Sequence, residues 1–176
     1  MLFNLLFFLL FFAGLLSIVF YTIRYGISPM PSSAKAKSRM LESIPLDTKG
    51  IIYELGSGWG SIALPLSSRF PNCIIRAYEI SPIPWLVSVT INYLFNSNKN
   101  LIIHRKDFYN CSLQDASVVV CYLYPGAMNK LKFKFETELK PGTIIISNTF
   151  AIPGWTPNSV YELNDIYKTK IYLYKL

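Results

Sequence analysis

The stretch Ile51-Ile52-Tyr53-Glu54-Leu55-Gly56-Ser57-Gly58-Trp59-Gly60 decides the fold of this chain. Its first part is a short apolar run of the kind that forms a buried strand. Its second part carries three glycines at alternate positions, which permit a tight turn and let a ligand approach the backbone closely. A helix predicted over 60–69 would present free N–H groups and positive potential to an anionic part of that ligand. The stretch therefore predicts a strand, a ligand-binding loop and a helix in succession.

Three acidic residues follow three consecutive predicted strands. Glu54 ends the first strand, Glu79 ends the second, and Asp107 lies just past the third. A carboxylate about 20 residues beyond such a glycine loop can accept both hydroxyl hydrogens of a ribose. Asp107 is placed to accept a hydrogen bond from an exocyclic adenine amine. The pattern indicates a cofactor that contains a nucleoside.

The glycine spacing distinguishes between nucleoside cofactors. A dinucleotide-binding loop would need glycine at position 61, where this chain has Ser61. The observed spacing favours S-adenosylmethionine over NAD or no cofactor, with Glu54 near the methionine ammonium and the loop near the carboxylate and ribose. We expect cofactor contacts from Glu54, Gly56, Ser57, Gly58, Gly60, Glu79 and Asp107.

Strand-like and helix-like segments alternate along the rest of the chain. Strands are predicted over 51–53, 74–78, 101–103, 118–122 and 143–147, and helices over 60–69, 85–95 and 127–139. This alternation predicts an α/β fold with a largely parallel sheet, covered by helices on both faces. Two further β-rich segments, 159–163 and 170–174, are expected to close the sheet as an antiparallel hairpin.

Residues 2–23 form an apolar run without a charged side chain. As a helix this run is roughly 33 Å long, enough to cross a hydrocarbon core. Its Leu, Ile, Val and Phe residues favour insertion by about 5 to 10 kcal/mol. We expect a membrane-spanning helix. A cleaved signal peptide and a buried core helix are the alternatives, and the absence of any Lys or Arg before Arg24 speaks against the first.

The charges after this run predict how the chain is oriented. Four basic residues follow before the first acidic one, Glu42: Arg24, Lys35, Lys37 and Arg39. The positive-inside rule then places the downstream domain on the cytoplasmic side of a single-pass protein. We expect a transmembrane anchor over 1–24, a linker and a helix capped by Ser32 or Ser33 over 25–44, and a single catalytic domain over 45–176.

The net charge and the cysteine content indicate which partners the protein can bind. The formal net charge of +7 is spread along the chain and suits a surface that faces the anionic lipid heads of a bilayer. Nucleic acid is the competing interpretation, but no arginine-rich run or aromatic RNA-binding motif occurs, so we expect no nucleic-acid partner. The three cysteines lie far apart without metal-ligand spacing. We therefore expect no metal, and buried thiols in a reducing compartment.

Several motifs outside the glycine loop carry a family resemblance. They are Pro29-Met30-Pro31-Ser32, Tyr78-Glu79-Ile80-Ser81-Pro82, Trp85-Leu86-Val87, Lys106-Asp107, Tyr122-Leu123-Tyr124-Pro125-Gly126, Glu138-Leu139-Lys140-Pro141-Gly142 and the segment from Phe150 to Trp155. With them the chain resembles the class I S-adenosylmethionine-dependent methyltransferases. It is similar to the membrane-anchored protein lysine methyltransferases that modify the ATP synthase c-subunit and the adenine nucleotide translocase. The resemblance implies a Rossmann-like seven-stranded methyltransferase sheet and methyl transfer to a lysine amine of a membrane protein.

The loop over 122–126 follows the fourth predicted strand, where amine methyltransferases of this fold place a proline-bearing acceptor loop. Tyr124 and Tyr122 are the candidate catalytic residues: Tyr124 can accept a hydrogen bond or face a methylammonium, and Tyr122 can add to the aromatic wall. Because the two alternate along a strand, one of them is expected only to pack. Pro125 and Trp155 are candidates for the substrate wall.

Two alternative functions remain open from the sequence. A methyltransferase acting on a lipid or quinone would also gain from a membrane tether, because the tether concentrates enzyme and substrate. A non-catalytic membrane protein could retain the fold as an interaction module. Transfer to a lysine of a membrane protein is the function that we expect.

Overall fold

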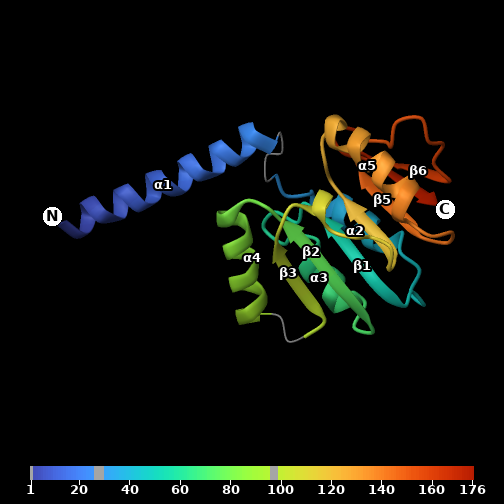
Figure 1. Cartoon of the computed structure of the whole chain (residues 1–176), viewed down its shortest axis with the longest axis horizontal. Helices are drawn as coiled ribbons and strands as arrows, with labels where there is room; N and C mark the ends of the chain where they lie inside the picture. Colours follow the sequence, from blue (N-terminus) through green and yellow to red (C-terminus); the bar gives the residue numbers. More distant parts are fainter. Residues whose placement is uncertain (1, 26–29, 96–98) are drawn as a thin grey trace.

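The computed structural model describes residues 2–25, 30–95 and 99–176. Its centre is a seven-stranded sheet in the order β3-β2-β1-β4-β5-β7-β6 (Figure 1). The strands are β1 (Gly50–Leu55), β2 (Cys73–Glu79), β3 (Leu101–Arg105), β4 (Ala116–Cys121), β5 (Ile144–Asn148), β6 (Ser159–Glu162) and β7 (Lys170–Lys175). Strands β1 to β5 are parallel, and β7 lies antiparallel between β5 and β6. The predicted parallel sheet with a closing antiparallel hairpin is confirmed.

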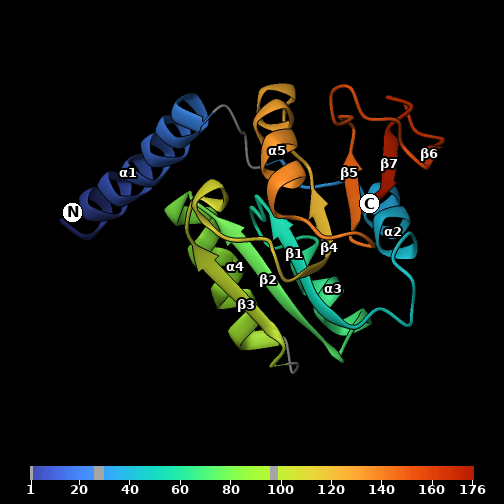
Figure 2. The same ribbon diagram turned by 45° about the vertical axis from the view of Figure 1, so that its right-hand side comes forward.

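The helices are α1 (Leu2–Tyr25), α2 (Ala34–Glu42), α3 (Ala63–Arg69), α4 (Pro82–Phe95) and α5 (Pro125–Glu138), with a short 3₁₀ turn η1 (Phe108–Asn110) after β3. Helices α2 to α5 form layers on the two faces of the sheet (Figure 2). Side chains of α2 and α3 share one core with Ile52 of β1, whereas α5 shares the other with Tyr53. Successive strand residues point to opposite faces, so the apolar strands supply both cores at once.

The helix after the glycine loop begins later than predicted. Residues 59–62 form turns and α3 starts at Ala63, because Gly60 has φ +80°, outside the right-handed helical region. Pro65 consequently lies in the first turn of α3, where a missing backbone N–H is tolerated. By contrast, α4 begins three residues earlier than predicted, since Pro82 suits the first position of a helix.

The segment before β1 is organised by a serine cap. Ser33 is the N-cap of α2, and its Oγ accepts the backbone N–H of Ala36 at 3.2 Å. Its neighbour Ser32 is buried and its Oγ accepts a hydrogen bond from Nδ2 of Asn148 at 3.2 Å. Ser32 therefore ties this segment to the end of β5. The part of the predicted linker over 26–29 lies outside the described residues.

Helix α1 extends away from the sheet (Figure 1). Its residues Asn4–Tyr25 have a mean hydropathy of 2.5 over their most apolar window and bury none of that window in the protein. Within the described residues it is the single helix long and apolar enough to span a membrane. Its C-terminal part contacts α4, which brings it close to the carboxyl ends of the strands.

Candidate active site

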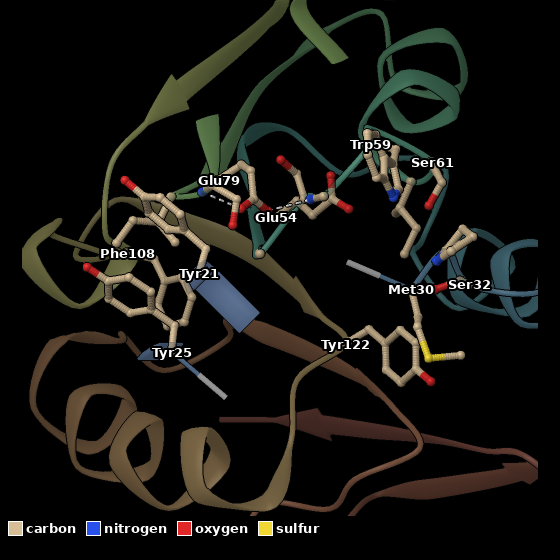
Figure 3. Close-up of a pocket in the computed structure, with 17 residues that line it drawn as sticks. Tyr21, Tyr25, Met30, Ser32, Glu54, Trp59, Ser61, Glu79, Phe108 and Tyr122 are labelled. Carbon is tan, nitrogen blue, oxygen red and sulfur yellow. Dashed lines mark hydrogen bonds between the residues drawn. The ribbon is translucent and has the colours of Figure 1, made fainter. Parts of the chain in front are cut away.

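A pocket opens at the carboxyl ends of β1, β2 and β4 (Figure 3). The strand order reverses between β1 and β4, and open α/β sheets bind ligands at such a reversal. The pocket encloses about 690 Å³, counting the space open to solvent at its mouth.

Glu54 is the most deeply placed acid of the pocket, with 2% of its surface exposed. Burial raises the pKa of this carboxyl well above its usual range, the nearby charge of Glu79 raises it further, and a backbone hydrogen bond from Ala63 opposes both effects. The other carboxyl oxygen, Oε2, is buried without a hydrogen-bond partner. A cationic group bound beside Glu54 would satisfy that oxygen and stabilise the charged form.

Glu79 ends β2 and organises the glycine loop. One of its oxygens accepts the backbone N–H of Gly58 at 2.7 Å, and the other accepts that of Ser81 at 2.7 Å. Each carboxylate oxygen can accept two hydrogen bonds, so Glu79 retains acceptor sites for ligand hydroxyls. Glu54 and Glu79 lie close together on neighbouring strands in Figure 3.

The three glycines of the loop have different surroundings, and all have positive φ. A Cβ on Gly56 would lie 2.8 Å from Leu123, and one on Gly60 would lie 3.1 Å from Cβ of Ser88 on α4. A Cβ on Gly58, which lines the pocket, would meet no atom within 4 Å. Close packing thus explains Gly56 and Gly60, and ligand access explains Gly58.

These features fit S-adenosylmethionine. Two orphaned buried polar atoms, Oε2 of Glu54 and Oγ of Ser57, belong to residues that line the pocket. The open space beside Gly58 admits a ligand close to the backbone. Glu54 and Ser57 would hold the amino-acid part, and Glu79 would hold the ribose hydroxyls. The sequence predicted all of these residues.

Two predicted cofactor residues do not line the pocket. Gly60 faces α4, as described above. Asp107 is the N-cap of η1, where its carboxylate accepts the backbone N–H of Tyr109 at 2.9 Å. Its neighbour Phe108 lines the pocket instead. Asp107 retains one carboxyl oxygen outside this bond, and its contact with adenine stays a prediction.

The structure separates the two candidate tyrosines of the acceptor loop. Tyr122 lines the pocket. Tyr124 is the N-cap of α5. Its ring packs against Gly126 so closely that a Cβ added to Gly126 would lie 2.6 Å from Cε2 of the tyrosine. Neither Pro125, which starts α5, nor Trp155, whose Nε1 donates to Glu136 at 3.1 Å, lines the pocket. Of the predicted acceptor residues, Tyr122 is the one that the fold brings to the cofactor site.

Several pocket residues were not predicted as site residues from the sequence, among them Tyr21, Tyr25, Met30 and Phe108. Tyr21 belongs to the apolar run over 2–23 that hydropathy assigns to the membrane, and Tyr25 to the predicted linker over 25–44, whereas the structure places both at the end of α1. Met30 belongs to one of the motifs that carry the family resemblance, but nothing in the sequence places that motif at the cofactor site. Phe108 follows Asp107 directly, and only the backbone turn at η1 decides which of the two faces the pocket.

The sheet order and this pocket define an S-adenosylmethionine-dependent methyltransferase of the class I fold. Residues 54–159 match the family model described as the ANTKMT methyltransferase domain. The chain belongs to that family, which confirms the resemblance, and its cofactor is S-adenosylmethionine.

Curated relatives support this assignment. The chain is 33% identical over 147 residues to a protein-lysine N-methyltransferase of Saccharolobus islandicus, covering 77% of this chain and 84% of that one. It is 29% identical over 143 residues to the mouse adenine nucleotide translocase lysine N-methyltransferase, covering 78% of this chain. It spans only 59% of the mouse protein's length.

A solved structure confirms the fold. The RNA methyltransferase of Salinibacter ruber, crystallised with S-adenosyl-L-homocysteine, superposes with a TM-score of 0.75 at 24% identity. The superposition covers 83% of this chain and 93% of that one. Since one fold serves many acceptors, this likeness carries no information about the acceptor of the present chain.

Proposed function

We propose that this chain is a membrane-anchored protein-lysine N-methyltransferase that modifies a lysine of a membrane protein. One observation carries the proposal: Tyr21 and Tyr25, at the end of the helix that can span a membrane, line the same pocket as Glu54 and Glu79. The chemistry would then take place at the membrane surface. In this proposal residues 1–24 are the anchor, 25–44 the linker with α2, and 45–176 the catalytic domain.

The relatives support lysine as the acceptor. The Saccharolobus islandicus protein is named as a protein-lysine N-methyltransferase, and the mouse protein as one that acts on the adenine nucleotide translocase. A lysine acceptor agrees with the aromatic residue Tyr122 on the pocket wall, because aromatic faces attract ammonium and methylammonium groups.

The surface of α4 supports contact with the bilayer. No charged residue occurs in this helix, and Leu86, Tyr93, Leu94 and Phe95 are all exposed on it, whereas its Ser88 is fully buried. Helix α4 contacts α1, and its axis is steeply inclined to that of α1 (Figure 1). If α1 crosses the bilayer, α4 lies along the membrane surface with its apolar side chains directed outward.

The proposed reaction makes modest demands on the protein. S-adenosylmethionine supplies a methyl group bonded to a positively charged sulfur. The acceptor lysine must approach in line and lose its proton, since only the neutral amine has a free electron pair. Desolvation in an apolar pocket beside a cation lowers the pKa of an amine from its usual value of about 10.4. The chain has to orient the amine and exclude water, and Tyr122 is placed to do so.

The decisive experiment identifies the molecule that receives the methyl group. Full-length protein and its Glu79→Ala variant are incubated with methyl-labelled S-adenosylmethionine and membranes from cells that lack the gene. A labelled protein band, absent with the variant and yielding methyl-lysine on hydrolysis, is the expected result. If the label instead partitions into organic solvent, the acceptor is a lipid or quinone and not a lysine.

Orientation needs a separate measurement. The basic residues that follow α1 favour a cytoplasmic catalytic domain. Protease added to the outside of intact cells should then leave residues 45–176 undigested, and it should digest them once the cells are opened. Digestion in intact cells would reverse the proposed topology.

A further inference from the structure

The end of α1 contributes two aromatic rings to the cofactor pocket. Tyr21 and Tyr25 are one helical turn apart, and their rings stack with centroids 5.7 Å apart and an interplanar angle of 18°. Both line the pocket. Figure 3 shows them with Phe108 at the end of the pocket next to Glu79, whereas Trp59 and Ser61 lie at the opposite end.

The position of Glu79 indicates which part of the cofactor lies at that end. A carboxylate at the end of the second strand holds the ribose hydroxyls, and Glu54 on the neighbouring strand faces the amino-acid part. With the amino-acid part beside Glu54 and the ribose beside Glu79, an adenine base would extend in the other direction, toward the residues that follow β3. Phe108 is one of those residues, so a bound base would reach the aromatic end of the pocket.

We propose that Tyr21 and Tyr25 bind the adenine base of S-adenosylmethionine, so that the anchor helix completes the cofactor pocket. The inference rests on the proposed function only in taking this pocket as the cofactor site; it holds for a lysine or a lipid acceptor alike. Tyrosine rings suit the role because every base has a face on which an aromatic side chain can stack. The phenol hydroxyls can remain in the polar layer at the membrane surface, where tyrosine is common.

This arrangement makes cofactor affinity depend on the anchor. The helix that tethers the enzyme also forms one wall of the site, so a protein without residues 2–25 would keep Glu54 and Glu79 but lack two of the three aromatic rings next to Glu79. Weak cofactor binding by such a shortened protein would therefore not mean that the domain has lost its chemistry.

The test measures binding without turnover. Full-length protein in lipid nanodiscs is titrated with S-adenosylhomocysteine in a calorimeter, beside the Tyr21→Ala/Tyr25→Ala and Tyr21→Phe/Tyr25→Phe double variants. The control is Ile23→Ala, on the opposite face of α1, where 78% of the side chain is exposed. We expect Kd to rise at least about 5-fold in the alanine variant, and to stay within about 2-fold in the phenylalanine variant and the control.

A second measurement does not depend on variants. Wild-type protein is irradiated with an 8-azidoadenine analogue of S-adenosylmethionine, and the labelled peptide is identified by mass spectrometry. Label on the peptide that contains Tyr21 and Tyr25 is the expected result. Label confined to peptides from the sheet, or an unchanged Kd in the alanine variant, would overturn the inference. Failure of the wild-type protein to bind S-adenosylhomocysteine would instead overturn the cofactor assignment.

Discussion

The carboxylate of Glu79 accepts the backbone N–H of Gly58 at 2.7 Å. The acid that ends β2 therefore holds the tip of the loop that follows β1, although the two residues are 21 positions apart in the sequence. The same carboxylate accepts the backbone N–H of Ser81, the residue directly before α4. One side chain thus fixes the shape of two loops and still has lone pairs for a ribose.

The first prediction concerns this side chain. Glu79→Ala removes charge-assisted hydrogen bonds to the ribose and should weaken the binding of S-adenosylhomocysteine by about 2 to 4 kcal/mol. It should also lower the melting temperature, because two backbone N–H groups lose their acceptor. Calorimetry and thermal unfolding measure the two effects. Glu162→Ala, on the edge strand β6, serves as the control, and unchanged binding in Glu79→Ala would refute the ribose assignment.

A second prediction separates backbone strain from ligand access. Gly58 and Gly142 both have positive φ, +52° and +90°, and at neither would a Cβ meet another atom within 4 Å. Alanine at either position should cost about 1 to 3 kcal/mol of stability through strain. Only Gly58 lines the pocket, so only Gly58→Ala should also weaken S-adenosylhomocysteine binding, by about 10-fold or more. Equal affinities of the two variants would argue against close approach of the cofactor to Gly58.

The third prediction follows from the raised pKa of Glu54, which burial causes first and Glu79 second. An acid with a native pKa above its unfolded value, about 4.3, holds more protons in the folded state. The free energy of unfolding of the cofactor-free protein should therefore fall as pH rises from that value through the native pKa. Denaturant titrations across this range measure the slope.

Replacement of Glu54 tests the origin of that slope. Glu54→Gln keeps the shape without the buried charge, so the slope should diminish and the melting temperature near pH 8 should rise by about 2 °C or more. The same variant should bind S-adenosylhomocysteine more weakly, since the ligand ammonium loses its carboxylate partner. A variant that is both less stable and equally tight in binding would contradict the role given to Glu54.

Much of the fold could be predicted from local sequence signals. The strand runs around Ile52 and Val119 are apolar on both faces, as a parallel sheet covered by helices requires. The strand around Ile75 is apolar on one face, and its other face carries Arg76. Boundaries were less predictable because they depend on backbone conformation: the positive φ of Gly60 delays α3, and Pro82 advances α4. Neither effect changes the hydrophobic pattern from which the helices were predicted.

The site was predictable where chemistry fixes residue type and spacing. Glu54, Ser57, Gly58 and Glu79 line the pocket as expected. Tyr21 could not be predicted, because its presence in the pocket depends on how α1 packs against α4, a contact between elements about 60 residues apart. Likewise, the sequence does not show that Phe108 and not Asp107 lines the pocket, because this depends on the backbone conformation of η1.

The exposed apolar surface of α4 leads to a fourth prediction. Leu86→Lys/Leu94→Lys adds charge to a helix that has none, on a face exposed in the folded protein. Labelling of a membrane acceptor should fall about 10-fold, because lysine side chains oppose burial of that face in the bilayer. Binding of S-adenosylhomocysteine should not change. The matched control is Val160→Lys on β6, also exposed, and equal labelling by the two proteins would remove α4 from membrane contact.

The last prediction distinguishes the two tyrosines of the acceptor loop. Tyr122 lines the pocket, whereas Tyr124 caps α5 and packs its ring against Gly126. Tyr122→Ala should lower kcat by about 10-fold or more, a loss of about 1.4 kcal/mol in transition-state stabilisation, with the Kd of S-adenosylhomocysteine unchanged. Tyr124→Ala should instead lower the melting temperature and leave kcat within about 3-fold of wild type at a temperature where it is folded. Steady-state kinetics on the labelled acceptor, with thermal unfolding of each variant, measure both. The opposite pattern would assign the acceptor contact to Tyr124 and would require the loop over 122–126 to turn when substrate binds, since the present geometry directs only Tyr122 into the pocket.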